Sequence, residues 1–353
     1  MTRSDVKSPM SPNLSERQKI LLALIIHEHT RSTQPVGSKN LIEQYSLDMS
    51  SATVRNEMVT LSEMGYIRQP HTSAGRVPTE EGYRFFVGQL MGNTELPSAT
   101  RSTITHQFYQ AGQDIDQWMR LAASVLANQS KAASLVTAPQ PVKARFKHLE
   151  LIELRGRQIL MVLVLSGGDV RQQMLTLAEP VSQERLSAVA ERISGLCQGI
   201  EYENIAALPG PTDALDQDIL HLVTTTMRQE NLLTGEVYRD GLINVLEEPE
   251  FAETASARRA LRVLEERPFL EDLLAQTIVN SDIGAVQVLI GGEGNWEELS
   301  DCSVVLARYG VPNLATGAVG VLGPVRMRYG QTISAVRFVA GLLSELVAES
   351  HAE

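Results

Sequence analysis

The amino-acid sequence predicts a mixed α+β protein of two or three domains, with a small helical unit at its N-terminus. Apolar residues recur at helical spacing in the first ninety positions, and serine or threonine residues precede these runs as caps. Strand-like apolar runs lie between 149 and 177 and between 286 and 322, on both sides of a mostly helical stretch at 201–275. This order predicts one α+β domain interrupted by an insertion.

Capping signals divide the first part of the chain into three helices. Ser15 and Gln18 have capping-box spacing, and the helix that they start is expected to end near position 30. Ser38 is predicted to cap a short helix that ends at position 45. Ser50 is predicted to cap a third helix over 51–64, which Gly65 ends.

A strand pair and a fourth helix follow. Positions 66–68 and 77–78 are expected to pair around the glycine-containing tip PHTSAGR. Thr79 then caps a helix that should run to about position 91, and the polar segment 92–102 is interpreted as a linker.

The rest of the chain is assigned to two further units. Residues 103–136 are expected to be helical, and further helices are expected near 182–196 and 333–347. The predicted boundaries are a first domain at 1–91, the linker at 92–102, an α+β domain at 103–200 and 276–353, and an inserted domain at 201–275.

The order of two helices, a tight turn, a third helix and a hairpin is that of a winged helix-turn-helix. A helical wheel places Val54, Met58 and Leu61 on the core face of the third helix. Its groove-facing end should therefore read DNA bases, since Arg can bind guanine and Asn can bind adenine in two-pronged contacts. The residues expected to contact the major groove are Ser51, Thr53, Arg55 and Asn56.

Two further segments are expected to contact DNA phosphates. Small residues in the hairpin tip would let the backbone approach phosphate, and Arg76 can add charge there or enter the minor groove. Ser38 and Lys39 begin another helix and are expected phosphate contacts. Arg68 and Arg84 are assigned solvated or structural roles instead. The hairpin residues expected at the DNA are His71, Thr72, Ser73, Gly75 and Arg76.

Charge is distributed unevenly along the chain. The formal net charge is −11, but residues 1–90 hold ten basic and nine acidic side chains, a net of +1. The remainder therefore carries −12, so any DNA contact should come from the N-terminal part. Two cysteines without a metal or disulfide spacing favour the reducing cytoplasm, and neither a signal peptide nor a membrane span is expected.

An enzyme is the main rival class, and the motifs argue against it. His27 and His29 point to different faces of a helix, so they are not expected to bind a metal. No GxSxG or Walker A pattern is present, and the glycine-rich run at 291–294 is not followed by a phosphate-binding helix. We therefore expect no catalysis, no cofactor and no metal.

Residues 14–87 closely resemble the N-terminal domain of the heat-inducible transcription repressor family HrcA. Thr33 and Ser51 stand where the family usually has Gly and often Pro, and neither change alters the expected DNA binding. The C-terminal part also resembles the family. The stretches that carry the resemblance are LSERQKIL, QPVGSKNLIEQY, SSATVRNEMVTLSEMGYI, QPHTSAGRVPTEEGYRFFV, DCSVVLARY and GPVRMRYGQTISAVRFVAGLLSEL.

The resemblance implies a dimeric repressor of chaperone operons that binds the inverted-repeat CIRCE operator and is kept active by the chaperonin GroEL. It also implies a winged helix, a GAF-like domain and a dimerising domain inserted into the GAF-like domain. Two alternatives remain open. One is a winged-helix repressor controlled by a small molecule in the GAF-like domain, and the other is a chaperonin client without operator binding.

Overall fold

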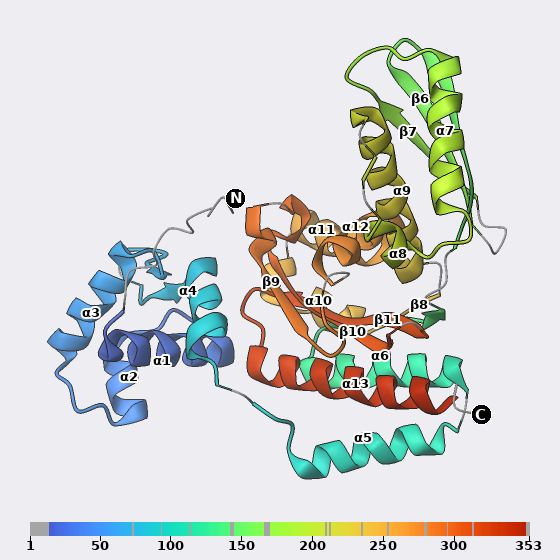
Figure 1. Ribbon diagram of the computed structural model, residues 1–353. Coiled ribbons are helices and arrows are strands. Elements are labelled where there is room, and N and C mark those ends of the chain that lie inside the picture. The colour runs from blue at the N-terminus through green and yellow to red at the C-terminus, as the bar shows by residue number, and fades with distance from the viewer. Residues whose placement is uncertain are drawn as a thin grey trace.

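Three parts make up the computed structural model. Figure 1 shows the N-terminal helices beside a body built on a central sheet, and a lobe with its own sheet that projects from that body. The structure describes residues 14–72, 74–92, 94–112, 114–141, 145–165, 170–208, 210–211, 213–233, 236–252, 254–278, 281–294, 296–312 and 314–350.

The N-terminal part has the predicted order of helices and strands. Val54, Met58 and Leu61 are buried on one side of α3, as the helical wheel predicts. Strands β1 and β2 pair antiparallel, and Gly65 at the end of α3 adopts a φ of +84°, which favours glycine. The bounds are α1 Glu16–Ser32, α2 Ser38–Tyr45, α3 Ser51–Glu63, β1 Ile67–Arg68 and β2 Val77–Pro78.

Three of the four predicted caps are confirmed. Ser15 and Gln18 form the capping box of α1, and the hydroxyls of Ser50 and Thr79 accept hydrogen bonds from backbone N–H groups of the next helix. The prediction for Ser38 is wrong, because Gly37 is the cap of α2 and Ser38 is its first residue. The backbone of Gly37 is already extended there, and α2 therefore lacks a side-chain cap.

The fourth helix differs from the expected continuous helix. Helix α4 (Glu80–Phe85) passes into a π-helical turn, η1 (Phe86–Leu90). Gly82 lets α4 pack closely on the backbone just before β1, because a Cβ there would lie 2.2 Å from the carbonyl oxygen of Tyr66. Helix α5 (Ser98–Gln110) then begins inside the predicted linker 92–102, directly after Pro97, which is the N-cap.

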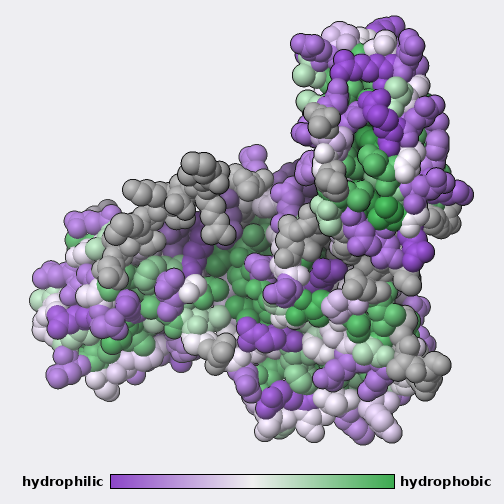
Figure 2. Space-filling view, in the orientation of Figure 1, coloured by the Kyte–Doolittle hydropathy of each residue, from purple (hydrophilic) through white to green (hydrophobic). Residues whose placement is uncertain are grey.

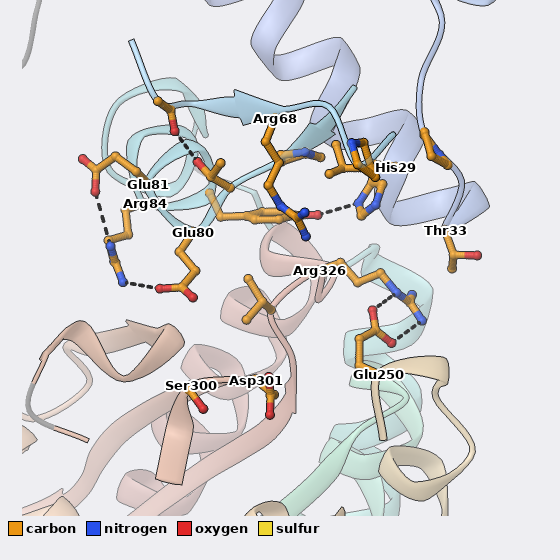
Figure 3. Close-up of a pocket in the computed structure, with 18 residues that line it drawn as sticks. His29, Thr33, Arg68, Glu80, Glu81, Arg84, Glu250, Ser300, Asp301 and Arg326 are labelled. Atoms are coloured by element: carbon orange, nitrogen blue, oxygen red, sulfur yellow. Dashed lines mark hydrogen bonds and ion pairs between the residues drawn. The ribbon is translucent and has the colours of Figure 1, made fainter. Parts of the chain in front are cut away.

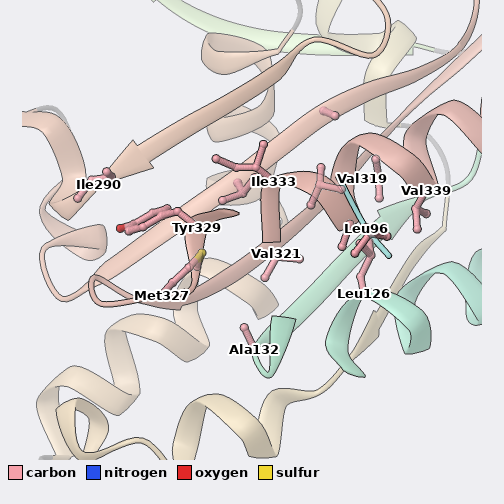
Figure 4. Packing of buried hydrophobic residues seen from close by; sticks show 14 of the residues in the cluster. Leu96, Leu126, Ala132, Ile290, Val319, Val321, Met327, Tyr329, Ile333 and Val339 are labelled. Carbon is pink, nitrogen blue, oxygen red and sulfur yellow. The ribbon is translucent and has the colours of Figure 1, made fainter. Parts of the chain in front are cut away.

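The body is an antiparallel sheet between two helical layers. Its strand order is β8-β3-β11-β10-β9, and β4 also pairs with β11. Alternate residues face the two layers, so Val319 and Val321 pack toward α13, whereas Ala318 and Leu322 pack toward α11 and α12. Figure 4 shows the first of these layers around Val321 and Ile333.

The elements of the body come from distant parts of the chain. Its strands are β3 Ala133–Thr137, β4 Gln140–Pro141, β8 Val237–Asp240, β9 Val286–Ile290, β10 Cys302–Val311 and β11 Ala315–Pro324. Its helices are α6 Ile115–Ser130, α10 Leu242–Leu246, η2 Pro249–Phe251, α11 Thr254–Glu265, α12 Arg267–Thr277, η3 Gly291–Gly294, η4 Glu297–Leu299 and α13 Tyr329–Ser350. Helix α13 is long and apolar enough to cross a membrane, but half of its most apolar stretch is buried in the body, as in a core helix.

The projecting lobe has a separate core. Strands β5, β6 and β7 form a three-stranded antiparallel sheet, and one face of it packs against α7 and α9. Leu151, Met161 and Leu163 on that face are fully buried. The bounds are β5 Phe146–Arg155, β6 Gln158–Leu165, β7 Val170–Thr176, α7 Gln183–Cys197, α8 Tyr202–Ala206 and α9 Ala214–Leu233.

The predicted limits of the inserted domain, 201–275, do not match this pairing. Strands β5–β7, assigned by the sequence to the interrupted domain, form the lobe instead of joining the central sheet. Strand β8 and helices α11 and α12, assigned to the insertion, belong to the body. The end of the predicted helical region 103–136 is also different, because β3 begins at Ala133. The errors in the domain limits concern pairing and packing partners that local periodicity does not specify.

Candidate nucleic-acid interface

Helix α3 presents an exposed face opposite its core. Arg55 and Asn56 lie on this face, and no side-chain partner is found for either within the described part of the chain. Val59, one turn further on, is 40% exposed. The two polar side chains therefore remain available for a ligand, while Val54 and Met58 hold the helix in the core.

The N-terminal ends of α2 and α3 lie next to each other. The hydroxyl oxygens of Ser38 and Ser51 are 3.3 Å apart. The hydroxyl of Thr53 is 2.9 Å from that of Ser50, the cap of α3, so its position is set by the cap. Lys39 is exposed beside them. Two helix N-termini, each with free N–H groups, thus face the same side of the protein.

The hairpin is attached to the start of α2. Val36 and Arg76 exchange two backbone hydrogen bonds of 2.8 and 2.9 Å. Gly75 permits this contact, because a Cβ there would lie 2.4 Å from the carbonyl oxygen of Val36. His71 and Thr72 are exposed at the tip, and Ser73 lies outside the described residues.

A narrow groove forms where the hairpin meets the two helices. Its volume is about 250 Å³, and its lining includes four of the predicted residues, Ser38, Arg55, Gly75 and Arg76. The Nε atom of Arg76 is buried and has no hydrogen-bond partner in the described structure. Two guanidinium groups therefore border one groove, which suits it to a phosphate or a base edge.

The other predicted residues that the structure describes are not among the lining residues of this groove. Lys39, Asn56, His71 and Thr72 are exposed on the same elements, and Thr53 is partly buried beside the cap. Gln69 also lines the groove, and the sequence analysis did not select it. Its side-chain amide donates to the carbonyl oxygens of Thr72 and Ala74, both at 2.9 Å. Its place at the base of the glycine-containing tip is the sequence feature from which this role of Gln69 could have been predicted.

A second, larger cavity of about 780 Å³ separates the N-terminal part from the body (Figure 3). Arg84, predicted to be solvated or structural, crosses the junction and donates to the carbonyl oxygen of Ile290 at 2.7 Å. On the other wall, Arg326 pairs with Glu248 and Glu250. The contact of Arg84 crosses the junction, whereas the pairs of Arg326 lie within the body, and charged groups therefore line both walls of the cavity.

His29 lies at this junction and is held neutral. Its Nδ1 atom is 2.9 Å from the hydroxyl of Tyr83. Burial lowers the pKa of His29, and the nearby charges of Arg326 and Arg68 lower it further, although Glu250 opposes them. His27 contacts Tyr45 instead, so the two histidines diverge as expected.

Metal ligands and reactive cysteines are the two other kinds of site considered among the described residues. In those ranges, no three His, Cys, Asp or Glu side chains are placed to hold a metal ion. Cys197 and Cys302 are buried, and burial raises the pKa of their thiols to about 11 and about 12. A thiol with such a pKa is protonated near neutral pH and is a poor nucleophile.

Comparisons with known proteins find relatives along almost the whole chain. The family model of the HrcA protein C-terminal domain matches residues 116–333. The heat-inducible transcription repressor HrcA of Roseiflexus castenholzii is 44% identical over 349 residues, covering 96% of both chains. That of Herpetosiphon aurantiacus is 40% identical over 352 residues, covering 98% of both.

One solved structure shares the overall fold. It is a crystal structure of a hypothetical protein, with a TM-score of 0.58, 20% sequence identity, and coverage of 96% of this chain and 100% of that one. At this identity the solved structure shows only that the fold is similar. The HrcA relatives, in contrast, are similar in sequence over almost the whole chain. The chain belongs to the HrcA family of heat-inducible transcription repressors.

Proposed function

We propose that residues 1–91 form a winged helix-turn-helix domain through which this repressor binds an inverted-repeat CIRCE operator. The observation that carries the proposal is the groove between α2, α3 and the hairpin, which has Arg55 and Arg76 on its border. Neither guanidinium has an ion-pair partner in the described ranges. Two arginines without ion-pair partners on a helix-turn-helix are suited to DNA binding, because Arg makes contacts both to phosphates and to guanine.

Helix α3 is the proposed recognition helix. Arg55 and Asn56 project from its exposed face and would reach base edges, while Ser51 and Thr53 at its first turn would contact bases or phosphate. Arg55→Ala and Asn56→Ala should each weaken specific operator binding by about 1–3 kcal/mol. Arg101→Ala is the control, because Arg101 pairs with Glu95 on the exposed surface of α5, away from the groove.

The measurement is fluorescence anisotropy of the full chain with operator DNA and with a scrambled duplex of equal length. The proposal expects a loss of discrimination in both α3 variants and not in Arg101→Ala. If both α3 variants distinguish the two duplexes as well as the unchanged protein does, α3 is not the recognition helix.

The remaining contacts would position the domain on the phosphate backbone. The first turn of α2 and the hairpin tip face the same side as α3, and they carry small side chains and cations. Gln69 would act indirectly, by holding the carbonyl groups of the tip. The proposed phosphate contacts are Ser38, Lys39, His71, Thr72, Ser73, Gly75 and Arg76.

We also propose that the protein is a homodimer, and we place the inserted dimerisation domain at the projecting lobe instead of at 201–275. The outer face of the lobe sheet carries a row of apolar residues, since Ile152 pairs with Leu160 and Leu160 with Met174. Ile152 is 41% exposed and Met174 is 67% exposed. Apolar surface of this kind marks an interaction site. Figure 2 shows the lobe from the side of α7 and α9, where apolar residues also reach the surface, and not from the side of this sheet face.

The dimer proposal is tested by the mass of the full chain in solution. Ile152→Asp combined with Met174→Asp should convert a dimer to a monomer and weaken operator binding, because an inverted repeat needs two linked domains. Ile243→Asp is the matched control, since Ile243 is 62% exposed on α10 in the body. A dimer that persists in the double variant would place the interface elsewhere.

For regulation, we propose that free GroEL chaperonin keeps the repressor active. A partner that binds the folded repressor raises its folded fraction by mass action. When heat-denatured clients occupy the chaperonin, less of it is free for the repressor, the folded fraction of the repressor falls, and the repressor leaves the operator. In this proposal the protein acts in the cytoplasm and catalyses no reaction. Operator occupancy against temperature, with chaperonin and with an added unfolded competitor, tests it. Occupancy that ignores both additions would favour thermal inactivation of the repressor itself.

The alternative is a repressor controlled by a small molecule in a GAF-like domain, which we assign to the body. The same occupancy measurement distinguishes it from control by chaperonin. In that case a metabolite, and not chaperonin, would protect the operator complex against heat.

A further inference from the structure

A smaller cavity lies on the other side of the contact between the N-terminal part and the body. Its volume is about 440 Å³, within the usual range of small-molecule sites. Helix α1 and turn η1 form one wall, and the segment 327–331 at the start of α13 forms the other. Tyr83 and Tyr329, whose ring centroids are 5.9 Å apart, join the two parts beside it. Any occupant would therefore touch both parts.

The floor of this cavity is apolar. Ile26, Met327 and Tyr329 line it and are 2%, 5% and 2% exposed. Figure 4 shows Met327 and Tyr329 side by side at the start of α13. Phe86 and Met91 complete the apolar wall. A flat ring or a short acyl chain would gain free energy by leaving water for this surface.

The charged groups at the rim are cations. Arg31 and Arg328 line the cavity, and no carboxylate is found among its described lining residues. Arg31 pairs with Glu28 at 3.3 Å, and the Glu28 side chain is only 13% exposed, so the charge of Arg31 is partly balanced. Arg328 has no partner in the described ranges. The larger junction cavity differs, because Glu80, Glu81, Glu250 and Asp301 line it.

We propose that this cavity binds a small amphipathic carboxylate, with its apolar body on Ile26, Met327 and Tyr329 and its carboxylate on Arg328. Guanidinium and carboxylate groups form charge-assisted hydrogen bonds that can be two-pronged. Thr30 and Thr94 line the same space, but the hydroxyl of Thr94 already donates to the carbonyl oxygen of Gly330 at 2.9 Å, so Arg328 is the principal donor for the carboxylate. Because the walls belong to two parts of the chain, the ligand stabilises their observed arrangement.

The test uses the full chain and three probes that share an apolar body or a charge. The probes are 1-naphthoate, its uncharged analogue 1-naphthylmethanol, and octanoate, whose binding is measured by titration calorimetry. We expect 1-naphthoate to bind once per chain and at least about tenfold more tightly than 1-naphthylmethanol, because only the anion uses Arg328. A tighter complex with octanoate would identify an acyl chain as the preferred body, and a tighter complex with 1-naphthoate an aromatic one.

Two arginine variants separate charge recognition from folding. Arg328→Gln should weaken 1-naphthoate binding about tenfold and leave 1-naphthylmethanol binding unchanged. Arg337→Gln is the control, since Arg337 is exposed on the same helix and outside the cavity. Equal affinity for the two naphthalene probes, equal behaviour of the two arginine variants, or no saturable binding of either carboxylate would overturn the proposal. Operator binding enters none of these measurements, so they are independent of the DNA proposal.

Discussion

Gly75→Ala should detach the hairpin from the start of α2. The added Cβ would lie 2.4 Å from the carbonyl oxygen of Val36 and 2.9 Å from the carbonyl carbon of Pro35. These are backbone atoms, so no side-chain rotation relieves the contact. The pair of hydrogen bonds between Val36 and Arg76 would then be lost, and each contributes a net of about 0.5–1.5 kcal/mol. The expected loss of stability is therefore about 1–3 kcal/mol.

The functional effect should be larger than the effect on the rest of the fold. Arg76 would leave the groove that it shares with Arg55, and one charge-assisted contact is worth about 1.5–3 kcal/mol. Operator affinity should consequently fall by about tenfold to a hundredfold. Gly88→Ala is the control, because no atom lies within 4 Å of a Cβ placed at Gly88.

Fluorescence anisotropy with operator DNA and thermal unfolding of the full chain measure both quantities. Amide hydrogen exchange of the hairpin adds a local readout. A Gly75→Ala protein that binds the operator as tightly as the Gly88→Ala protein, with unchanged exchange in the hairpin, would refute the reasoning from the close backbone contact.

The remaining predictions concern the cap, the hairpin cation and the junction histidine. Ser50→Ala should lower the free energy of unfolding by about 1 kcal/mol, because the cap of α3 is lost; denaturant unfolding with Ser62→Ala as control measures it. Arg76→Ala should weaken operator and scrambled DNA alike and reduce the salt dependence of binding by about one phosphate contact, so a selective loss for the operator would contradict its role. Burial lowers the pKa of His29 below its ordinary 6.5, so the unfolded chain binds more protons there and stability should fall as pH decreases through that value. His29→Gln should make the urea midpoint of unfolding less dependent on pH between about pH 5 and about pH 8. A variant with the same pH dependence as the unchanged protein would contradict this.

Local features of the fold could be predicted from the sequence because short-range interactions create them. The box formed by Ser15 and Gln18 depends on residues three apart, and so does the cap of α3 at Ser50. The buried side of α3 follows from the periodicity of an α-helix. Ser38 shows the limit, since Gly37 in extended conformation takes the cap position one residue earlier.

The candidate groove could be predicted only in part. Sequence reasoning selected Arg55 and Arg76 for separate reasons, one on a recognition helix and one in a hairpin, but their common groove depends on the contact between Gly75 and Val36. The role of Gln69 in holding the hairpin tip was missed, because its partners are backbone carbonyl groups whose orientation follows from the folded loop.

The sequence by itself determined the starts of α1, α3 and α4, the buried face of α3 and the family, since each depends on nearby residues or on an ordered run of them. Only the tertiary structure decided which strands share a sheet. Strand β8 pairs with β3, about a hundred residues earlier in the chain, whereas β5–β7 pair only among themselves in the described structure. An apolar run shows that a strand needs cover and partners, but hydrogen-bonding groups are the same in every strand. The choice of partner is therefore made by the packing of helices and cores that lie far apart in sequence.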